Sequence, residues 1–158
     1  LFKIWVFGKG IEILGMIKIF KDDKSTGKEL RKAAKSLKEH NSNNGALTPY
    51  LVAFPEGTRT KDKGYKMSEF KRGLFTIAIK YDLPIIPIAS YGGLDVTPKS
   101  SWIFKKGTIY EKILEPLFPK NYGGSSIKEK SILLQNDTRQ RINQGLHELI
   151  RTYGNGTI

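Results

Sequence analysis

The stretch LVAFPEGTRTKDKG, residues 51–64, changes from apolar to polar within a few positions. Residues 50–54 form a continuous apolar run without alternation, which is typical of a strand covered on both faces. Pro55 then fixes the direction in which the chain leaves, and Gly57 allows a sharp bend and the close approach of a ligand. Ligands of α/β proteins bind at the loops that leave the carboxyl ends of parallel strands. The stretch therefore predicts a binding loop at the end of a buried strand.

The side chains of this loop suit a ligand that carries both a phosphate and a hydroxyl. The guanidinium of Arg59 is a planar fork of donors that fits a phosphate, and Thr58 adds a hydroxyl and a backbone N–H. Glu56 can accept a hydrogen bond from a substrate hydroxyl, or it can hold Arg59 in register. Further positive charge surrounds them, from Lys61, Lys63, Lys66, Lys71 and Arg72. A glycerol phosphate fits this set, and the alternative is a purely structural strand-to-loop turn.

Upstream of the loop, the pattern predicts a strand and then a helix. Residues 16–20 (MIKIF) are a short apolar run that predicts a strand. Thr26 and Glu29 have the spacing of a capping box, which predicts the start of a helix. Its apolar stripe consists of Leu30, Ala33, Ala34 and Leu37, with lysines on the solvated side. The polar segment at residues 40–49 predicts a loop.

Downstream of the loop, a second helix and a further strand are predicted. Residues 68–81 carry an apolar stripe at helical spacing, made of Phe70, Leu74, Ile77, Ala78 and Tyr81. Residues 84–89 (PIIPIA) predict another buried strand, whose prolines favour a sheet edge or a strand end. Strands that alternate with helices favour an α/β fold with a largely parallel sheet and helices packed on it.

The last third of the chain predicts a hairpin and a long helix. Residues 102–114 are interpreted as a hairpin that turns at Lys106 and Gly107. A helix from Ile127 to about Thr152 is expected to dock on the sheet through Ile142, Leu146, Leu149 and Ile150. The length, 158 residues, and the absence of a linker predict one domain over residues 1–158.

The charge of the chain predicts an anionic partner but does not identify it. The chain has 27 Lys and Arg against 15 Asp and Glu, a net charge of +12. Nucleic acid, an anionic bilayer or a phosphorylated substrate would match this charge. The cations are spread along the chain, and no nucleic-acid-binding motif appears, so a nucleic-acid-binding module is the less favoured class. The lack of cysteine excludes disulfides and thiolate metal sites, no metal site is expected, and no apolar run could span a bilayer.

Several motifs agree in order and spacing with one known family. FPEGTR, residues 54–59, resembles the third signature block of the glycerolipid acyltransferases, the 1-acylglycerol-3-phosphate (lysophosphatidic acid) acyltransferases. GMIKIFK, residues 15–21, is similar to the second block, G-x-x-F-I-x-R, with Lys18 where Phe is usual and Lys21 where the family has Arg. EFKRGLFTIA (69–78) resembles the segment that joins the third and fourth blocks, and LPIIPIA (83–89) resembles the fourth. The similarity covers roughly residues 3–117.

The resemblance implies a glycerol-3-phosphate acyltransferase-like α/β fold and a transfer of an acyl group. The acyl donor would be acyl-CoA or acyl carrier protein, and no cofactor is implied. The acceptor would be the sn-2 hydroxyl of lysophosphatidic acid, and the product would be phosphatidic acid. The implied residues for the phosphate and glycerol are Glu56, Gly57, Thr58, Arg59 and Lys21, with motif support from Phe54, Pro55, Lys71, Gly73 and Pro87. The resemblance also implies a role in phospholipid biosynthesis. The protein would act at the surface of the endoplasmic reticulum or of another intracellular membrane. Residues 1–20 mix Phe, Trp, Ile and Leu with Lys3, Lys9 and Lys18, a composition that suits such a surface, and core packing is the alternative explanation.

One departure concerns the general base. In the family, the His of an H-x-x-x-x-D motif activates the hydroxyl, and the Asp orients it. Here His40 is followed five positions on by Gly45, and His147 by Thr152. No catalytic residue is therefore expected in this chain, and we expect the motif to lie upstream of Leu1 in a longer polypeptide. The alternative is a catalytically silent homologue that binds lipid phosphate.

Overall fold

The computed structural model describes residues 23–41, 50–58, 65–97, 103 and 105–154. The chain divides into two compact units, Leu1–Leu51 and Val52–Ile158, which are treated separately below. The described elements are α2 (Asp23–Asn41), α3 (Arg72–Tyr81), β1 (Ile88–Tyr91), α4 (Gly93–Val96), β2 (Tyr110–Ile113), the 3-10 turn η1 (Pro119–Asn121) and α5 (Ile127–Tyr153). The strand predicted at residues 16–20 and most of the loop predicted at 40–49 lie outside the described residues. The prediction of a single domain stays a prediction.

The helix predicted in the first unit is confirmed as α2, with an earlier start. It begins at Asp23, so Thr26 lies inside the first turns, and its predicted role as N-cap is wrong. Leu30 and Ala34 of the predicted stripe are buried. Lysines and glutamates three or four positions apart form ion pairs, as expected of a solvated side.

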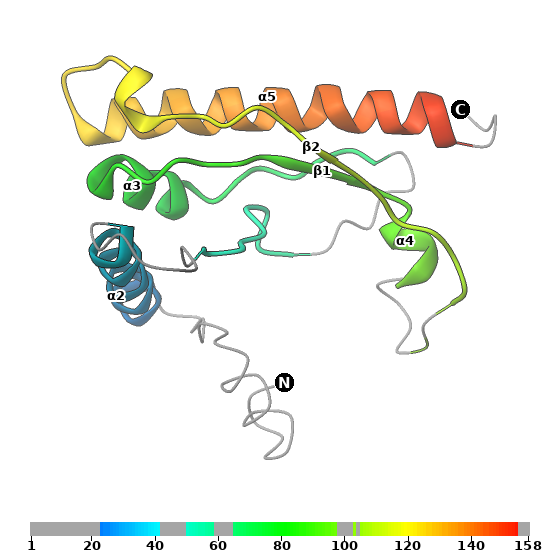
Figure 1. The fold of residues 1–158 in the computed structure, drawn as a ribbon, viewed down its shortest axis with the longest axis horizontal. Coiled ribbons are helices and arrows are strands. Elements are labelled where there is room, and N and C mark those ends of the chain that lie inside the picture. The colour runs from blue at the N-terminus through cyan, green and yellow to red at the C-terminus, as the bar shows by residue number, and fades with distance from the viewer. Residues whose placement is uncertain (1–22, 42–49, 59–64, 98–102, 104, 155–158) are drawn as a thin grey trace. The chain divides into compact units, whose positions relative to one another are not determined.

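The helix predicted at the C-terminal end is confirmed as α5. It packs against α3, β1 and β2, and Figure 1 shows it as the long orange-to-red helix beside them. Its N-cap, Ser126, accepts the N–H of Glu129 at 3.2 Å, and the Glu129 carboxylate accepts the N–H of Ser125 at 2.9 Å. These bonds from Ser125 hold the pKa of Glu129 below its usual range. The reciprocal capping fixes where the helix begins.

Two apolar clusters form the core between α5 and the rest of the second unit. The first consists of Phe70, Phe75, Ala78, Leu117 and Leu134, and the second of Ala89, Leu146 and Leu149. Met67 and Ile142 pack against both clusters and join them. At Gly145 a Cβ would lie only 3.1 Å from the Cβ of Ala89, so this glycine lets α5 approach β1 closely.

The observed sheet differs from the predicted one in its pairing. β1 pairs with β2 in an antiparallel manner, with Ile88 opposite Ile113, and a separate antiparallel bridge joins Ile85 to Leu117. The predicted hairpin within residues 102–114 is therefore wrong, because the partner of β2 is β1. This pairing lets Tyr110 pack against the second apolar cluster beside β1. The α/β class is consistent with these elements, whereas the largely parallel sheet stays a prediction.

Two predictions of strands buried on both faces are wrong. In the described part of the chain, residues 50–54 form no strand, and Phe54 is 82% exposed. β1 begins at Ile88, directly after Pro87, as expected of a proline at a strand end. α5 packs against β1, where Ala89 is buried, and Ile88 remains exposed on the other face of the strand. Ile86, which precedes β1, is exposed as well.

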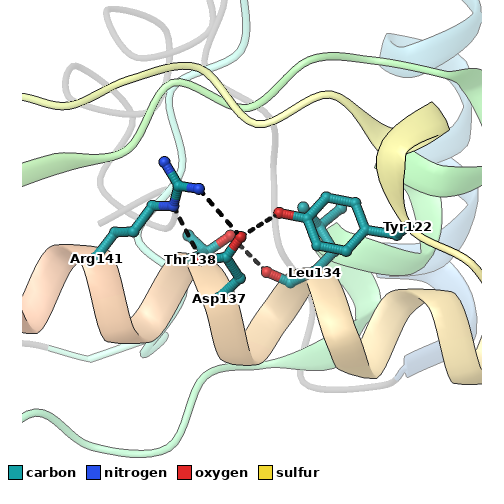
Figure 2. A network of polar contacts seen from close by, with 5 residues as sticks. All are labelled: Tyr122, Leu134, Asp137, Thr138 and Arg141. Atoms are coloured by element: carbon teal, nitrogen blue, oxygen red, sulfur yellow. Dashed lines mark hydrogen bonds and ion pairs between the residues drawn. The ribbon is translucent and has the colours of Figure 1, made fainter.

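A polar network joins the middle of α5 to the segment before the helix. The Tyr122 hydroxyl donates to Asp137 Oδ2 at 2.5 Å, and Arg141 Nε donates to Asp137 Oδ1 at 2.9 Å (Figure 2). Burial alone would raise the pKa of Asp137, but the hydrogen bonds from Arg141 and Tyr122 outweigh it and lower that pKa. Burial and the Asp137 carboxylate together raise the pKa of Tyr122. The network thus favours the ionised form of Asp137.

We expect Asp137→Asn to change the response of the protein to acid. The pKa of Asp137 is lower in the folded chain than its ordinary value of about 4. The ionised carboxylate therefore stabilises the folded state fully above about pH 4. The stabilisation is lost as the pH falls through the folded pKa. Urea unfolding from pH 6 down to pH 2 should therefore show a smaller loss of stability in the variant. Asp82→Asn, at the exposed C-cap of α3, is the control; an equal slope in Asp137→Asn and the wild type would contradict the prediction.

Candidate functional site

The FPEGT motif folds into a tight turn. The N–H of Gly57 donates to the C=O of Phe54 at 3.0 Å, which closes a four-residue β-turn with Pro55 in its second position. Gly57 has a φ of +67°, in the left-handed region that side chains other than glycine rarely adopt. The bend predicted at this glycine is confirmed. Thr58 follows the turn and is exposed.

Two hydrogen bonds hold this turn against residues 65–71. Glu56 Oε2 accepts the N–H of Ser68 at 2.8 Å, and the C=O of Pro55 accepts the N–H of Lys71 at 2.7 Å. Glu56 was predicted to contact a substrate hydroxyl or Arg59, and the structure shows that one of its oxygens binds the backbone of Ser68. No local pattern predicts this bond, since the partners are twelve residues apart and one is a backbone group.

Residues 65–71 form neither helix nor strand, so the predicted helix begins later than expected. α3 starts at Arg72 rather than at residue 68, because the backbone N–H groups of Ser68 and Lys71 bind the turn. The buried side of the segment is apolar and consists of Tyr65, Met67 and Phe70. These side chains anchor the segment in both clusters of the core.

Tyr65 fixes the beginning of this segment. Its ring centroid lies 4.8 Å from that of Tyr91 in β1, and its φ of +55° is unusual for a tyrosine. Burial first, and the nearby charge of Asp95 second, raise the pKa of the Tyr65 hydroxyl. The segment is thus held at Tyr65 by ring packing and at Ser68 and Lys71 by the turn.

The remaining predicted site residues are Arg59, Lys21, Lys71, Gly73 and Pro87. Arg59 and Lys21 lie outside the described residues, so their contact with a phosphate stays a prediction. Lys71 is at the N-cap of α3, and its aliphatic chain lies beside Gly57. Gly73 is the second residue of α3 and is exposed.

Pro87 has a packing role, as its sequence context suggested. It is buried, and its C=O accepts the N–H of Leu114 at 3.0 Å, just before the β1–β2 pairing begins. Within the described part of the chain, no three His, Asp or Glu side chains come together in a way that could hold a metal ion.

Gly57→Ala and Gly73→Ala should change stability in opposite directions. At Gly57 an added Cβ would meet Lys71 at an ordinary 3.7 Å, so the cost comes from the positive φ, about 1 kcal/mol. At Gly73, on α3, a Cβ meets nothing within 4 Å, and alanine should stabilise by roughly 0.5 kcal/mol. Urea unfolding of both variants measures this difference. Equal stability of the two variants would mean that the left-handed turn is not required.

The chain belongs to an acyltransferase family: residues 1–91, more than half of it, match the family model described as Acyltransferase. Among solved structures, it is similar to the 1-acyl-sn-glycerophosphate acyltransferase PlsC of Thermotoga maritima. That likeness has a TM-score of 0.67 at 29% identity and covers 90% of this chain and 51% of that one. The α/β fold implied by the resemblance is thereby confirmed.

Curated relatives extend the same similarity. The 1-acyl-sn-glycerol-3-phosphate acyltransferase BAT2, chloroplastic, of Brassica napus is 28% identical over 93% of this chain. The 1-acyl-sn-glycerol-3-phosphate acyltransferase of Saccharomyces cerevisiae is 35% identical over 50% of it. The chain spans 38% and 26% of the lengths of these two relatives.

Proposed function

We propose that the protein is an O-acyltransferase that acylates the sn-2 hydroxyl of lysophosphatidic acid and gives phosphatidic acid. The observation that carries the proposal is the FPEGT turn, held in a defined shape by Glu56 and Pro55. It precedes Arg59 within a chain that matches the Acyltransferase family. The three similar proteins described above are each named for lysophosphatidic acid as the acceptor, which supports this acceptor over other lysophospholipids.

In this proposal the turn recognises the phosphoglycerol end of the acceptor. Arg59 binds the phosphate with its two-pronged guanidinium, and Thr58 supplies a further donor beside the tight bend at Gly57. Lys71, whose aliphatic chain lies beside Gly57, adds positive charge near the turn. A phosphate contact of Lys21 stays a prediction from the family resemblance. Because one oxygen of Glu56 already binds Ser68, the carboxylate stands in a fixed position toward the acceptor.

The proposed reaction is an attack of the acceptor hydroxyl on the thioester of acyl-CoA or acyl carrier protein. A new C–O ester bond forms, the C–S bond breaks, and the hydroxyl proton passes to a base and then to the leaving thiolate. His147 is exposed on α5 and is followed five positions on by Thr152, so the H-x-x-x-x-D pattern is absent there. No described residue is assigned as the base.

We further propose that the protein works at the surface of an intracellular membrane, where its acceptor and product reside. Its net charge of +12 would attract anionic lipids. No helix in the described ranges has the length and apolar character needed to cross a bilayer. Binding to vesicles of 30% phosphatidylserine should exceed binding to duplex DNA at the same ionic strength, and the reverse would favour a nucleic-acid-binding module.

A pair of acceptors that differ in the phosphate alone tests the function. The complete enzyme, supplied with acyl-CoA, should acylate lysophosphatidic acid and should leave the matching monoacylglycerol nearly untouched. Repeating the assay with acyl carrier protein as donor identifies the donor. Binding of lysophosphatidic acid without any release of thiol would instead identify a silent lipid-phosphate-binding homologue, and equal acylation of both acceptors would contradict a phosphate-binding site.

A further inference from the structure

We infer that Gln135 and Arg139 of α5 are positioning residues for the FPEGT turn. Gln135 Nε2 donates to the C=O of Phe70 at 2.7 Å, and Arg139 Nη2 donates to the C=O of Met67 at 3.4 Å. The two side chains are four positions apart and therefore lie on one side of the helix. The inference rests on the proposed function, because it concerns the same acceptor-binding turn.

The two carbonyls belong to the same peptide groups that hold the turn. The peptide group between Phe70 and Lys71 accepts a bond from Gln135 with its C=O and donates its N–H to Pro55. The peptide group between Met67 and Ser68 accepts a bond from Arg139 and donates its N–H to Glu56. Each peptide group thus links α5 to the turn.

The geometry of a trans peptide makes this link directional. Its C=O and N–H point to opposite sides, so α5 and the turn are bound on opposite sides of the segment at residues 65–71. Hydrogen bonds in such chains polarise and strengthen one another. A donor on α5 therefore both orients the peptide plane and strengthens the bond that the same peptide makes to the turn.

Of the two side chains, Gln135 makes the stronger hydrogen bond to the segment at residues 65–71. Its bond is shorter, and the side chain is half-buried, whereas Arg139 is exposed and its bond is long. Loss of the Gln135 donor leaves the Phe70 carbonyl without this partner and frees the peptide to rotate. The turn at residues 54–57 then loses its fixed position relative to the core.

Three substitutions of similar length test the role. Gln135→Met removes the donor and keeps the stem, and Gln135→Glu places an acceptor against the Phe70 carbonyl. Gln135→Lys keeps a donor and should rescue the function. Gln144→Met, at an exposed glutamine of the same helix, is the matched control.

Steady-state kinetics of the complete enzyme give the first readout. Gln135→Met should raise the KM for lysophosphatidic acid roughly three- to ten-fold, as expected for the loss of one hydrogen bond, with the KM for acyl-CoA unchanged. Gln135→Glu should raise it further, and Gln135→Lys should stay near the wild type. Equal increases in both KM values, or a Gln135→Met enzyme that behaves as Gln144→Met, would overturn the positioning role.

Amide hydrogen exchange without substrate gives a readout that does not depend on the reaction. The N–H groups of Ser68 and Lys71 should exchange roughly three- to ten-fold faster in Gln135→Met than in Gln144→Met. Unchanged exchange would overturn the link between α5 and the turn. If the wild-type enzyme shows no acyl transfer, the proposed function fails, and the exchange rates still decide whether Gln135 holds the turn.

Discussion

Replacing Arg59 with alanine is expected to lower kcat/KM for lysophosphatidic acid by about 100-fold or more in the complete enzyme. A guanidinium bound to a phosphate contributes two charge-assisted hydrogen bonds, each of about 1.5 to 3 kcal/mol. Lysine at this position keeps the charge and loses the fork, so Arg59→Lys should fall between alanine and the wild type. The measurement is the initial rate of phosphatidic acid formation at several acceptor concentrations.

Arg151→Ala is the control for a general loss of positive charge, since Arg151 is exposed in the last turn of α5. It should leave kcat/KM within a factor of about two, because exposed charges are screened. If Arg59→Ala and Arg151→Ala have the same small effect, Arg59 does not bind the phosphate, and the proposed role of the FPEGTR motif is wrong.

Phe70→Ala is expected to destabilise the protein by about 3 to 5 kcal/mol, the usual cost of removing a buried phenyl ring. Phe70 is 4% exposed and packs in the first apolar cluster. Its ring is stacked on that of Phe75, with 6.2 Å between the ring centroids. Its backbone also carries the bond to Gln135, so the loss of the ring should loosen the segment that holds the turn. Urea unfolding followed by circular dichroism measures the change.

Phe54→Ala, in the FPEGT turn, is the control for the loss of stability expected of Phe70→Ala. Phe54 is 82% exposed, and a surface substitution of this kind changes stability by about 0.5 kcal/mol or less. Similar losses of stability in the two variants would contradict the packing described for residues 65–71.

The helices could be predicted from sequence because their signals are local. The stripes around Leu30 and Leu146 have helical spacing, and both helices are present in the structure. The start of α3, in contrast, depended on contacts far along the chain: it begins at Arg72, not at residue 68, because the turn binds the N–H groups of Ser68 and Lys71. Long-range hydrogen bonds of this kind leave no periodic signal.

Strand pairing was harder to predict, for the same reason. The hairpin expected at Lys106 and Gly107 followed from local turn chemistry, but β2 pairs with β1 instead, where α5 covers both strands. The run at residues 50–54 was interpreted as a buried strand because it is apolar without alternation, and its side chains are exposed in the structure.

The candidate site was predicted in part. The turn at Pro55 and Gly57 is confirmed, because proline and glycine restrict the backbone locally. The role of Glu56 toward Ser68, and the links from Gln135 and Arg139, depend on the tertiary arrangement and could not be found from spacing. The roles of Arg59 and Lys21 remain predictions, Arg59 from the chemistry of the loop and Lys21 from the family resemblance.

The central claim is that the FPEGTR motif binds the phosphate of the acceptor. A crystal structure of the complete enzyme with glycerol 3-phosphate tests this claim most directly. We expect phosphate oxygens about 2.7 to 2.9 Å from the guanidinium of Arg59, beside the turn at Gly57. A phosphate bound elsewhere, with Arg59 free of it, would contradict the account.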